Sequence, residues 1–226
     1  MKLLVIGHGK HGKDTAAEML STELQLTNAS SSWVACVEFV FDRLGSEGTN
    51  YASKLACWKD RRSSDHMRAR WFDLIAAYNT PDPAALAKLL LSRADIYTGM
   101  RSRDEYDACA QENLFDLVVW VEAFRREQAE GVGSMQLSRD DADIIIDNNG
   151  TPEQLAQRIR RLCKAPWVIE TVEIGGSVTP TVCPRCREPQ PPEARERHGR
   201  CCQCGLHGRC CHCGYDMLTI TGEDYA

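Results

Sequence analysis

The chain has 226 residues, enough for one α/β domain of ordinary size and a small appendage. Its net charge of -5 excludes a basic surface over the whole molecule, so any nucleic-acid contact would have to be local. No apolar run is long enough for a membrane span or for a signal peptide, so we expect no membrane partner and a cytoplasmic location.

The first quarter of the chain predicts a strand, a glycine-rich turn and a helix. Residues 3–6 are an apolar run, and residues 16–20 beyond the turn have helical spacing. Residues 34–41 are apolar and fit either a helix or a strand, whereas residues 45–53 are rich in Gly, Ser and Asn and predict a loop.

Helices dominate the next segment. A helix from about residue 64 places apolar side chains on one face, namely Met67, Trp71, Leu74, Ile75 and Tyr78. A second helix is predicted over residues 84–91, followed by a strand and turn over 94–101 and a helix over 104–110.

Two more strands complete the pattern. Residues 115–121 have the continuous apolar character of a strand buried on both faces, and residues 143–147 predict a shorter buried strand. A helix over 152–162 follows, with Thr151 as its cap and Pro152 in its first turn. Strands that alternate with helices predict a parallel sheet that binds its ligand at the carboxyl ends of the strands.

The glycine-rich turn has the pattern of a phosphate-binding loop. It lies between a predicted strand and a predicted helix, the context in which such a motif is informative. Its glycines allow backbone N–H groups and the helix N-terminus to point at a phosphate, and the lysine can reach the β- and γ-phosphates of a nucleotide. The motif therefore predicts binding of a nucleoside triphosphate by Gly7, His8, Gly9, Lys10, His11, Gly12, Lys13, Asp14 and Thr15.

The motif departs from the usual pattern after its lysine. Where a Ser or Thr would ligate Mg²⁺, this chain has Asp14, with Thr15 one residue later. A carboxylate is a hard oxygen ligand that can hold Mg²⁺ directly or through water. The alternatives for Asp14 are an N-terminal helix cap and a group that orients the acceptor.

The distribution of cysteines is uneven. Of 12 cysteines, eight lie between residues 183 and 213, after a linker-like segment containing Gly175, Gly176 and Pro180. In a reducing compartment, repeated C-x-x-C pairs predict a metal site rather than disulfides. The predicted Zn²⁺ ligands are Cys183, Cys186, Cys201, Cys204, Cys210 and Cys213, and the spacing leaves the pairing and the choice between one and two ions open.

Taken together, these motifs resemble the bacteriophage-type deoxynucleoside monophosphate kinase clade of P-loop kinases. The resemblance covers about residues 1–165 and is carried by the Gly-Lys-Asp-Thr element at 12–15, the turn at 99–101 with Asp104 and Glu105 after it, and the segment 142–151. It implies a three-layer α/β kinase core (residues 1–165) that uses ATP and Mg²⁺, and a bacterial host cytoplasm. A linker (166–182) and a small zinc-ribbon-like domain (183–226) follow, and this cysteine-rich region departs from the family.

Two acceptors are compatible with the resemblance. One is a free deoxynucleoside monophosphate. The other is DNA that carries 5-hydroxymethyluracil, because related phage kinases phosphorylate its hydroxymethyl group, and we favour this one slightly. The zinc-binding region, with arginines such as Arg185 and Arg209, would grip the polymer or act only as a structural staple. A third possibility is a zinc-ribbon binding module whose P-loop domain is a nucleotide switch.

The resemblance also assigns residues to the acceptor side. Ser32 and Trp33 follow the first helix, where such kinases contact the acceptor, and Trp33 would stack on a base or be buried in the core. Arg101 resembles the arginine after the equivalent strand and is predicted to be catalytic with Lys13 and Asp14, or else to pair with Asp104 or Glu105. The polar residues 122–142 predict a mobile cover over the site, whose cationic side chains are Arg125, Arg126 and Arg139.

Overall fold

A parallel β-sheet forms the centre of the computed structural model, which describes residues 1–131, 134–164 and 219–220. Among these residues the sheet order is β2-β3-β1-β4-β5-β6. The strands are β1 (Leu3–Ile6), β2 (Asn28–Ser30), β3 (Ile96–Thr98), β4 (Leu117–Glu122), β5 (Ile144–Asp147) and β6 (Thr219–Ile220). The predicted parallel α/β core is therefore confirmed.

The register places the strand ends in line. Leu4 of β1 lies opposite Tyr97 of β3 on one side and opposite Val118 of β4 on the other. Because all pairings are parallel, the carboxyl ends of the strands meet at one edge of the sheet. The short β2 was not predicted, because Asn28–Ser30 is polar and has no apolar run.

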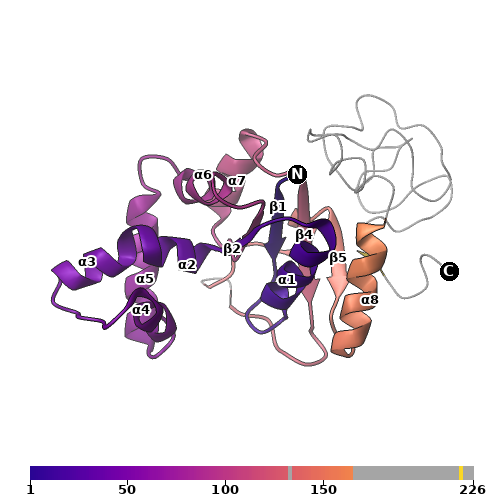
Figure 1. The fold of residues 1–226 in the computed structure, drawn as a ribbon, viewed down its shortest axis with the longest axis horizontal. Helices are drawn as coiled ribbons and strands as arrows, with labels where there is room; N and C mark the ends of the chain where they lie inside the picture. Colours follow the sequence, from indigo (N-terminus) through magenta and orange to yellow (C-terminus); the bar gives the residue numbers. More distant parts are fainter. Residues whose placement is uncertain (132–133, 165–218, 221–226) are drawn as a thin grey trace.

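Helices cover both faces of the sheet. On one face, Leu3 and Val5 pack against α1 (Lys13–Leu24) and α8 (Pro152–Cys163), which lie side by side (Figure 1). On the other, Leu4 and Ile6 belong to the core built with α6 (Ala85–Leu91) and with Cys109 of α7 (Arg103–Gln111). Alternate residues of β1 thus serve opposite layers, which is why its sequence is apolar throughout.

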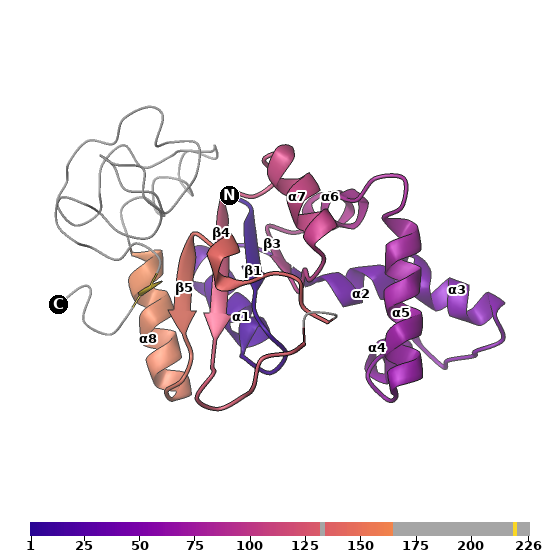
Figure 2. The same ribbon diagram turned by 180° about the vertical axis from the view of Figure 1, so that it is seen from behind.

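The remaining helices project beyond the β2 edge of the sheet, as both views show (Figures 1 and 2). They are α2 (Ser31–Ala35), a π-helical turn (Cys36–Val40), α3 (Phe41–Ser46), α4 (Lys54–Asp60) and α5 (Asp65–Tyr78). The ambiguous segment 34–41 is therefore helical, and α3 extends into the predicted loop as far as Ser46. The apolar face predicted for α5 packs into the core through Trp71 and Leu74.

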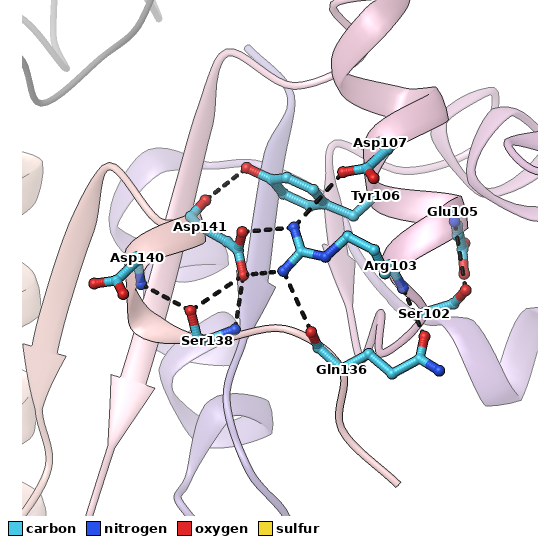
Figure 3. Close-up of polar contacts among 9 residues, drawn as sticks. All are labelled: Ser102, Arg103, Glu105, Tyr106, Asp107, Gln136, Ser138, Asp140 and Asp141. Atoms are coloured by element: carbon cyan, nitrogen blue, oxygen red, sulfur yellow. Dashed lines mark hydrogen bonds and ion pairs between the residues drawn. The ribbon is translucent and has the colours of Figure 1, made fainter. Parts of the chain in front are cut away.

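The segment between β4 and β5 is anchored at its far end by Arg103, at the start of α7 (Figure 3). The guanidinium of Arg103 donates two hydrogen bonds of 2.7 Å to the carboxylate of Asp141, and its backbone N–H donates to Oε1 of Gln136. Tyr106 adds a 2.6 Å bond from its hydroxyl to the carbonyl of Asp141. These contacts hold the short 3₁₀ turn Arg139–Asp141 against α7.

Two further predictions concern the membrane and the domains. Among the described residues, no helix has both the length and the apolar character needed to cross a membrane.

The predicted linker and all six predicted zinc ligands lie outside the described residues, so those boundaries and ligands stay predictions. Residues Thr219–Ile220 pair in parallel with β5.

Candidate functional site

The glycine-rich loop, defined as residues 7–12, lies at the carboxyl end of β1. β1 lies at the topological switch point of the sheet: β2 and β3, which follow it in the chain, lie on one side of it, and β4 and β5 lie on the other. In open parallel sheets such a point is where ligands bind. The loop leads directly into α1, whose first residue is Lys13.

Two glycines are required by the packing around the loop. Gly7 has φ +147°, and a Cβ there would lie 2.4 Å from the carbonyl oxygen of Val121 on β4. Gly12 has φ +89°, and a Cβ there would lie 2.2 Å from Nδ2 of Asn148. Any other residue at either position would have a strained backbone and would clash, so the loop requires glycine at both positions.

Lys13 has a buried side chain that ends near opposite charge. The residue is 5 % exposed, and its Nζ lies 3.9 Å from Oδ1 of Asp14. Burial lowers the pKa of Lys13; the charges of Arg101 and Arg62 also lower it, while those of Asp14 and Glu130 raise it. An ammonium held away from water and close to other cations is suited to receive an anion.

Asp14 lies in the first turn of α1 and is exposed. Gly12 occupies the N-cap position of that helix, so the alternative that Asp14 is the cap is wrong. No cluster of three or more His, Cys, Asp or Glu side chains that could hold a metal occurs in the described part of the chain. A carboxylate beside a phosphate-binding loop nevertheless fits Mg²⁺, which takes one or two carboxylates and completes its shell with water and phosphate oxygens.

Arg101 lies at the same edge of the sheet, just after β3. Its guanidinium forms an ion pair of 3.0 Å with Glu130 and donates to the carbonyl of Ser134 at 3.0 Å. The predicted alternative partners were Asp104 and Glu105, and the observed partner is instead a residue far along the chain. The charge of Arg101 lowers the pKa of Lys13, so the two cations lie near each other.

The predicted acceptor residues lie where β2 ends. Ser32 accepts a hydrogen bond of 3.0 Å from Nε1 of Trp58, and the rings of Trp33 and Trp58 meet edge to face at 5.7 Å. Trp33 is 37 % exposed, so it is not the buried core residue that was the alternative.

Arg61 completes this surface. Its guanidinium stacks on Trp58 at 3.9 Å from the ring centroid and donates to the carbonyl of that residue. Burial lowers the pKa of Arg61 to about 10, the charge of Arg62 lowers it as well, and that of Asp14 raises it. We name Ser32, Trp33, Trp58 and Arg61 the tryptophan cluster. The charge of Asp14, in the first turn of α1, acts on Arg61 of this cluster.

The arginines of the segment 123–141 have different positions. Arg126 donates from its guanidinium to the carbonyl of Asn148, whereas the backbone N–H of Arg125 donates to Oδ1 of Asn149 at 2.7 Å. Arg139 lies 3.8 Å from the carboxylate of Glu122. None of these contacts joins one of the three guanidinium groups to the glycine-rich loop, so their predicted role there stays a prediction.

The two loop histidines bind the segment that follows β4. Nδ1 of His11 accepts from the backbone N–H of Ala123 at 3.1 Å, and its Nε2 lies 3.2 Å from the carbonyl of Glu127. Nδ1 of His8 accepts from the backbone N–H of Glu130 at 3.1 Å. Burial lowers the pKa of His8, as does the neighbouring His11, and both effects favour the neutral ring that accepts this bond. The histidines thus have a specific structural role that the sequence motif did not indicate.

Comparisons with known proteins add little to this geometry. No protein-family model matches the chain, and no curated protein matches it. A crystal structure of an unliganded sugar kinase from Janibacter sp. HTCC2649 is similar over 74 % of this chain and 96 % of that one, at 21 % identity and a TM-score of 0.36. No assignment of fold or activity follows from a TM-score of this size. The class that fold and loop define is a parallel α/β protein with a glycine-rich loop at the switch point of its sheet.

Proposed function

We propose that the chain is an ATP- and Mg²⁺-dependent phosphotransferase. The single observation that carries this proposal is the buried Lys13 at the end of a glycine-rich loop, at the carboxyl edge of a parallel sheet. Helix N-termini and glycine-rich loops bind phosphate through backbone N–H groups, and the lysine adds a positive charge where the γ-phosphate is transferred.

Each residue of the site has a role in this reaction. The glycine-rich loop and Lys13 hold the β- and γ-phosphates, and Arg101 stabilises the charge that develops on the moving phosphoryl group. Asp14 would hold Mg²⁺, which neutralises the phosphate oxygens when it is bound. The acceptor oxygen forms a bond to the γ-phosphorus while the bond from that phosphorus to the oxygen bridging to the β-phosphate breaks, which leaves ADP. Where the acceptor is a hydroxyl group, its proton is released to solvent.

The tryptophan cluster supports a nucleotide as the acceptor. Trp33 offers an exposed aromatic face for a base, and Arg61 and Arg62 offer positive charge for a phosphate on the side of Lys13 and Asp14. Within this class we favour the hydroxymethyl group of 5-hydroxymethyl-deoxyuridine in DNA, because the cysteine-rich region adds arginines that suit a polymer. A base acted on within DNA must leave the stack, and Trp33 is a surface on which it could then stack.

A free deoxynucleoside monophosphate is the alternative acceptor. One exposed aromatic ring with two arginines nearby matches one base and one phosphate, which is all that such a substrate presents. The nucleotide switch differs from both, because it would hydrolyse ATP in the presence of DNA without phosphorylating an acceptor.

One experiment separates the three. γ-Labelled ATP and Mg²⁺ are incubated with the full chain and either deoxynucleoside monophosphates or DNA containing 5-hydroxymethyluracil, with thymine DNA of the same sequence as control. We expect label on the hydroxymethyluracil DNA only, and none with Lys13→Ala. Label on monophosphates alone would replace the favoured acceptor by the alternative, and label on neither, with DNA-dependent hydrolysis, would contradict the phosphotransferase.

A further inference from the structure

The carboxylate of Glu130 occupies the glycine-rich loop. It accepts a hydrogen bond from the backbone N–H of Gly9, and both of its oxygens lie 3.0 Å from Nη1 of Arg101. A Cβ at Gly9 would lie 3.0 Å from Oε1 of Glu130, so the carboxylate is seated against the backbone of the loop. Its charge also acts on Lys13. A backbone N–H of the loop, an arginine and a nearby lysine are the groups that a phosphate oxygen would use.

Glu130 is held there from more than one side. Its own N–H is bound by His8, and two residues of the same segment, Ala123 and Glu127, are bound by His11. Beyond it, the N–H of Gln136 donates to the carbonyl of Arg101 at 3.0 Å, and Arg103 holds Asp141 (Figure 3). These contacts place the carboxylate of Glu130 in the loop.

The carboxylate is ionised near neutral pH. Burial alone would raise the pKa of Glu130, but the hydrogen bonds from Arg101 and from the Gly9 N–H lower it below its ordinary value. Two anions cannot share these donors, since like charges at such a separation repel strongly where water is scarce.

We propose that Glu130 is an autoinhibitory anion that occupies the phosphate position of the glycine-rich loop and must leave before a nucleotide binds. The inference rests on the proposed nucleotide binding at this loop. When the carboxylate leaves, Arg101 loses its anionic partner and keeps only its contacts with Ser134. One displacement therefore frees the backbone donor of Gly9 and leaves the charge of Arg101 for the incoming phosphate. The apparent dissociation constant of the nucleotide is then the intrinsic one divided by the fraction of molecules from which Glu130 has left.

The test is calorimetric titration of the full chain with Mg²⁺ and ADP. Glu130→Gln removes the charge with almost no change in shape. We expect the dissociation constant of the nucleotide to fall by about tenfold, which corresponds to a wild type in which the carboxylate has left the loop in about one-tenth of the molecules. Glu127→Gln is the matched control: it removes the same charge from the same segment, but the Glu127 carboxylate lies 3.9 Å from the exposed Lys10 and is not bonded to the loop backbone. Its dissociation constant should stay within twofold of that of the wild type.

Equal affinities of Glu130→Gln and Glu127→Gln would overturn the inference, as would weaker binding by Glu130→Gln.

If Glu130→Gln does not fold, Glu130→Asp is measured instead. It keeps the charge but is one methylene shorter, so it cannot span Gly9 and Arg101, and its affinity should still exceed that of the wild type; an unchanged affinity would contradict the inference. If the wild type binds nucleotide and Lys13→Ala does not, the proposed nucleotide binding stands. A negative result with the Glu130 variants then contradicts only the inference about Glu130. Absence of binding in both the wild type and Glu130→Gln would overturn the proposed function and this inference together.

Discussion

The side-chain amide of Asn148 fills the space in which residue 12 would carry a Cβ atom. Its Nδ2 lies 2.2 Å from that position and donates a hydrogen bond of 2.9 Å to the carbonyl of His11. Asn148 directly follows β5, so the turn after that strand supports the end of the glycine-rich loop. The conformation of the loop therefore depends on tertiary contacts as well as on its own glycines.

Gly12→Ala should destabilise the protein by about 1–3 kcal/mol more than a glycine substitution that is strained but unobstructed. Gly48→Ala is the matched control, because Gly48 has φ +90° with no atom near the position of a Cβ. Both variants carry the cost of a left-handed alanine, and only Gly12→Ala adds the clash with Asn148. Urea unfolding measures the difference, and equal losses in the two variants would show that the clash is absent.

Glu105 should make the free energy of unfolding fall as pH rises towards neutrality, whereas a carboxylate with a lowered pKa would have the opposite effect. It is 5 % exposed and accepts a 2.6 Å bond from the hydroxyl of Tyr97, and burial raises its pKa to about 7. An unfolded glutamate has a pKa of about 4.3, so the folded state binds the proton more tightly. The stability that this contributes is complete below about pH 4 and is lost as pH rises through about 7.

Glu105→Gln keeps an oxygen that accepts from Tyr97 and removes the titration. Relative to the wild type, the variant should gain stability between pH 4.5 and pH 8 by at most roughly 3 kcal/mol. Most of the free energy that corresponds to the difference between the folded pKa of about 7 and the unfolded pKa of about 4.3 is lost between these two pH values. Thermal or urea unfolding at the two pH values measures this gain. A difference between variant and wild type that is the same at both pH values would contradict the raised pKa.

Trp33→Ala should weaken acceptor binding and leave nucleotide binding intact. Stacking of a base on an aromatic ring is worth about 1–3 kcal/mol, so the KM for the acceptor should rise by about fivefold or more. Trp33→Phe should recover part of the loss, because it restores an aromatic face. Phe72, an exposed aromatic side chain of α5, is the matched control, and Phe72→Ala should not change the KM. An unchanged KM in Trp33→Ala would remove this residue from the acceptor side.

The features that followed from the sequence are those with a local pattern. The apolar run of β1, the glycine-rich loop and α1 were all visible, because strand, turn and helix each have their own residue signal there. The apolar face of α5 was visible for the same reason, since its spacing matches the helical period. Residues 34–41 have no such period and were ambiguous until packing made them helical.

The features that the sequence did not indicate depend on contacts between distant residues. Glu130 reaches Gly9 across 121 positions of the chain, and no local pattern marks it as a partner of the loop. Arg61 is distinguished from an ordinary solvated arginine only by its position on the ring of Trp58. The roles of His8 and His11 likewise became visible only when β4 placed its following segment beside them.

Binding of Mg²⁺–ATP to Lys13→Ala and Lys10→Ala tests the central claim most directly, because both variants remove one lysine from the same motif. Lys13 is buried at the start of α1, whereas the Lys10 side chain is exposed. Loss of a charge-assisted contact worth about 1.5–3 kcal/mol should weaken binding by Lys13→Ala at least about tenfold. Lys10→Ala keeps the backbone N–H through which the loop binds phosphate, so it should bind nearly as the wild type does. Equal affinities in the two variants, or no binding by either the wild type or Glu130→Gln, would contradict a phosphate-binding role for this loop.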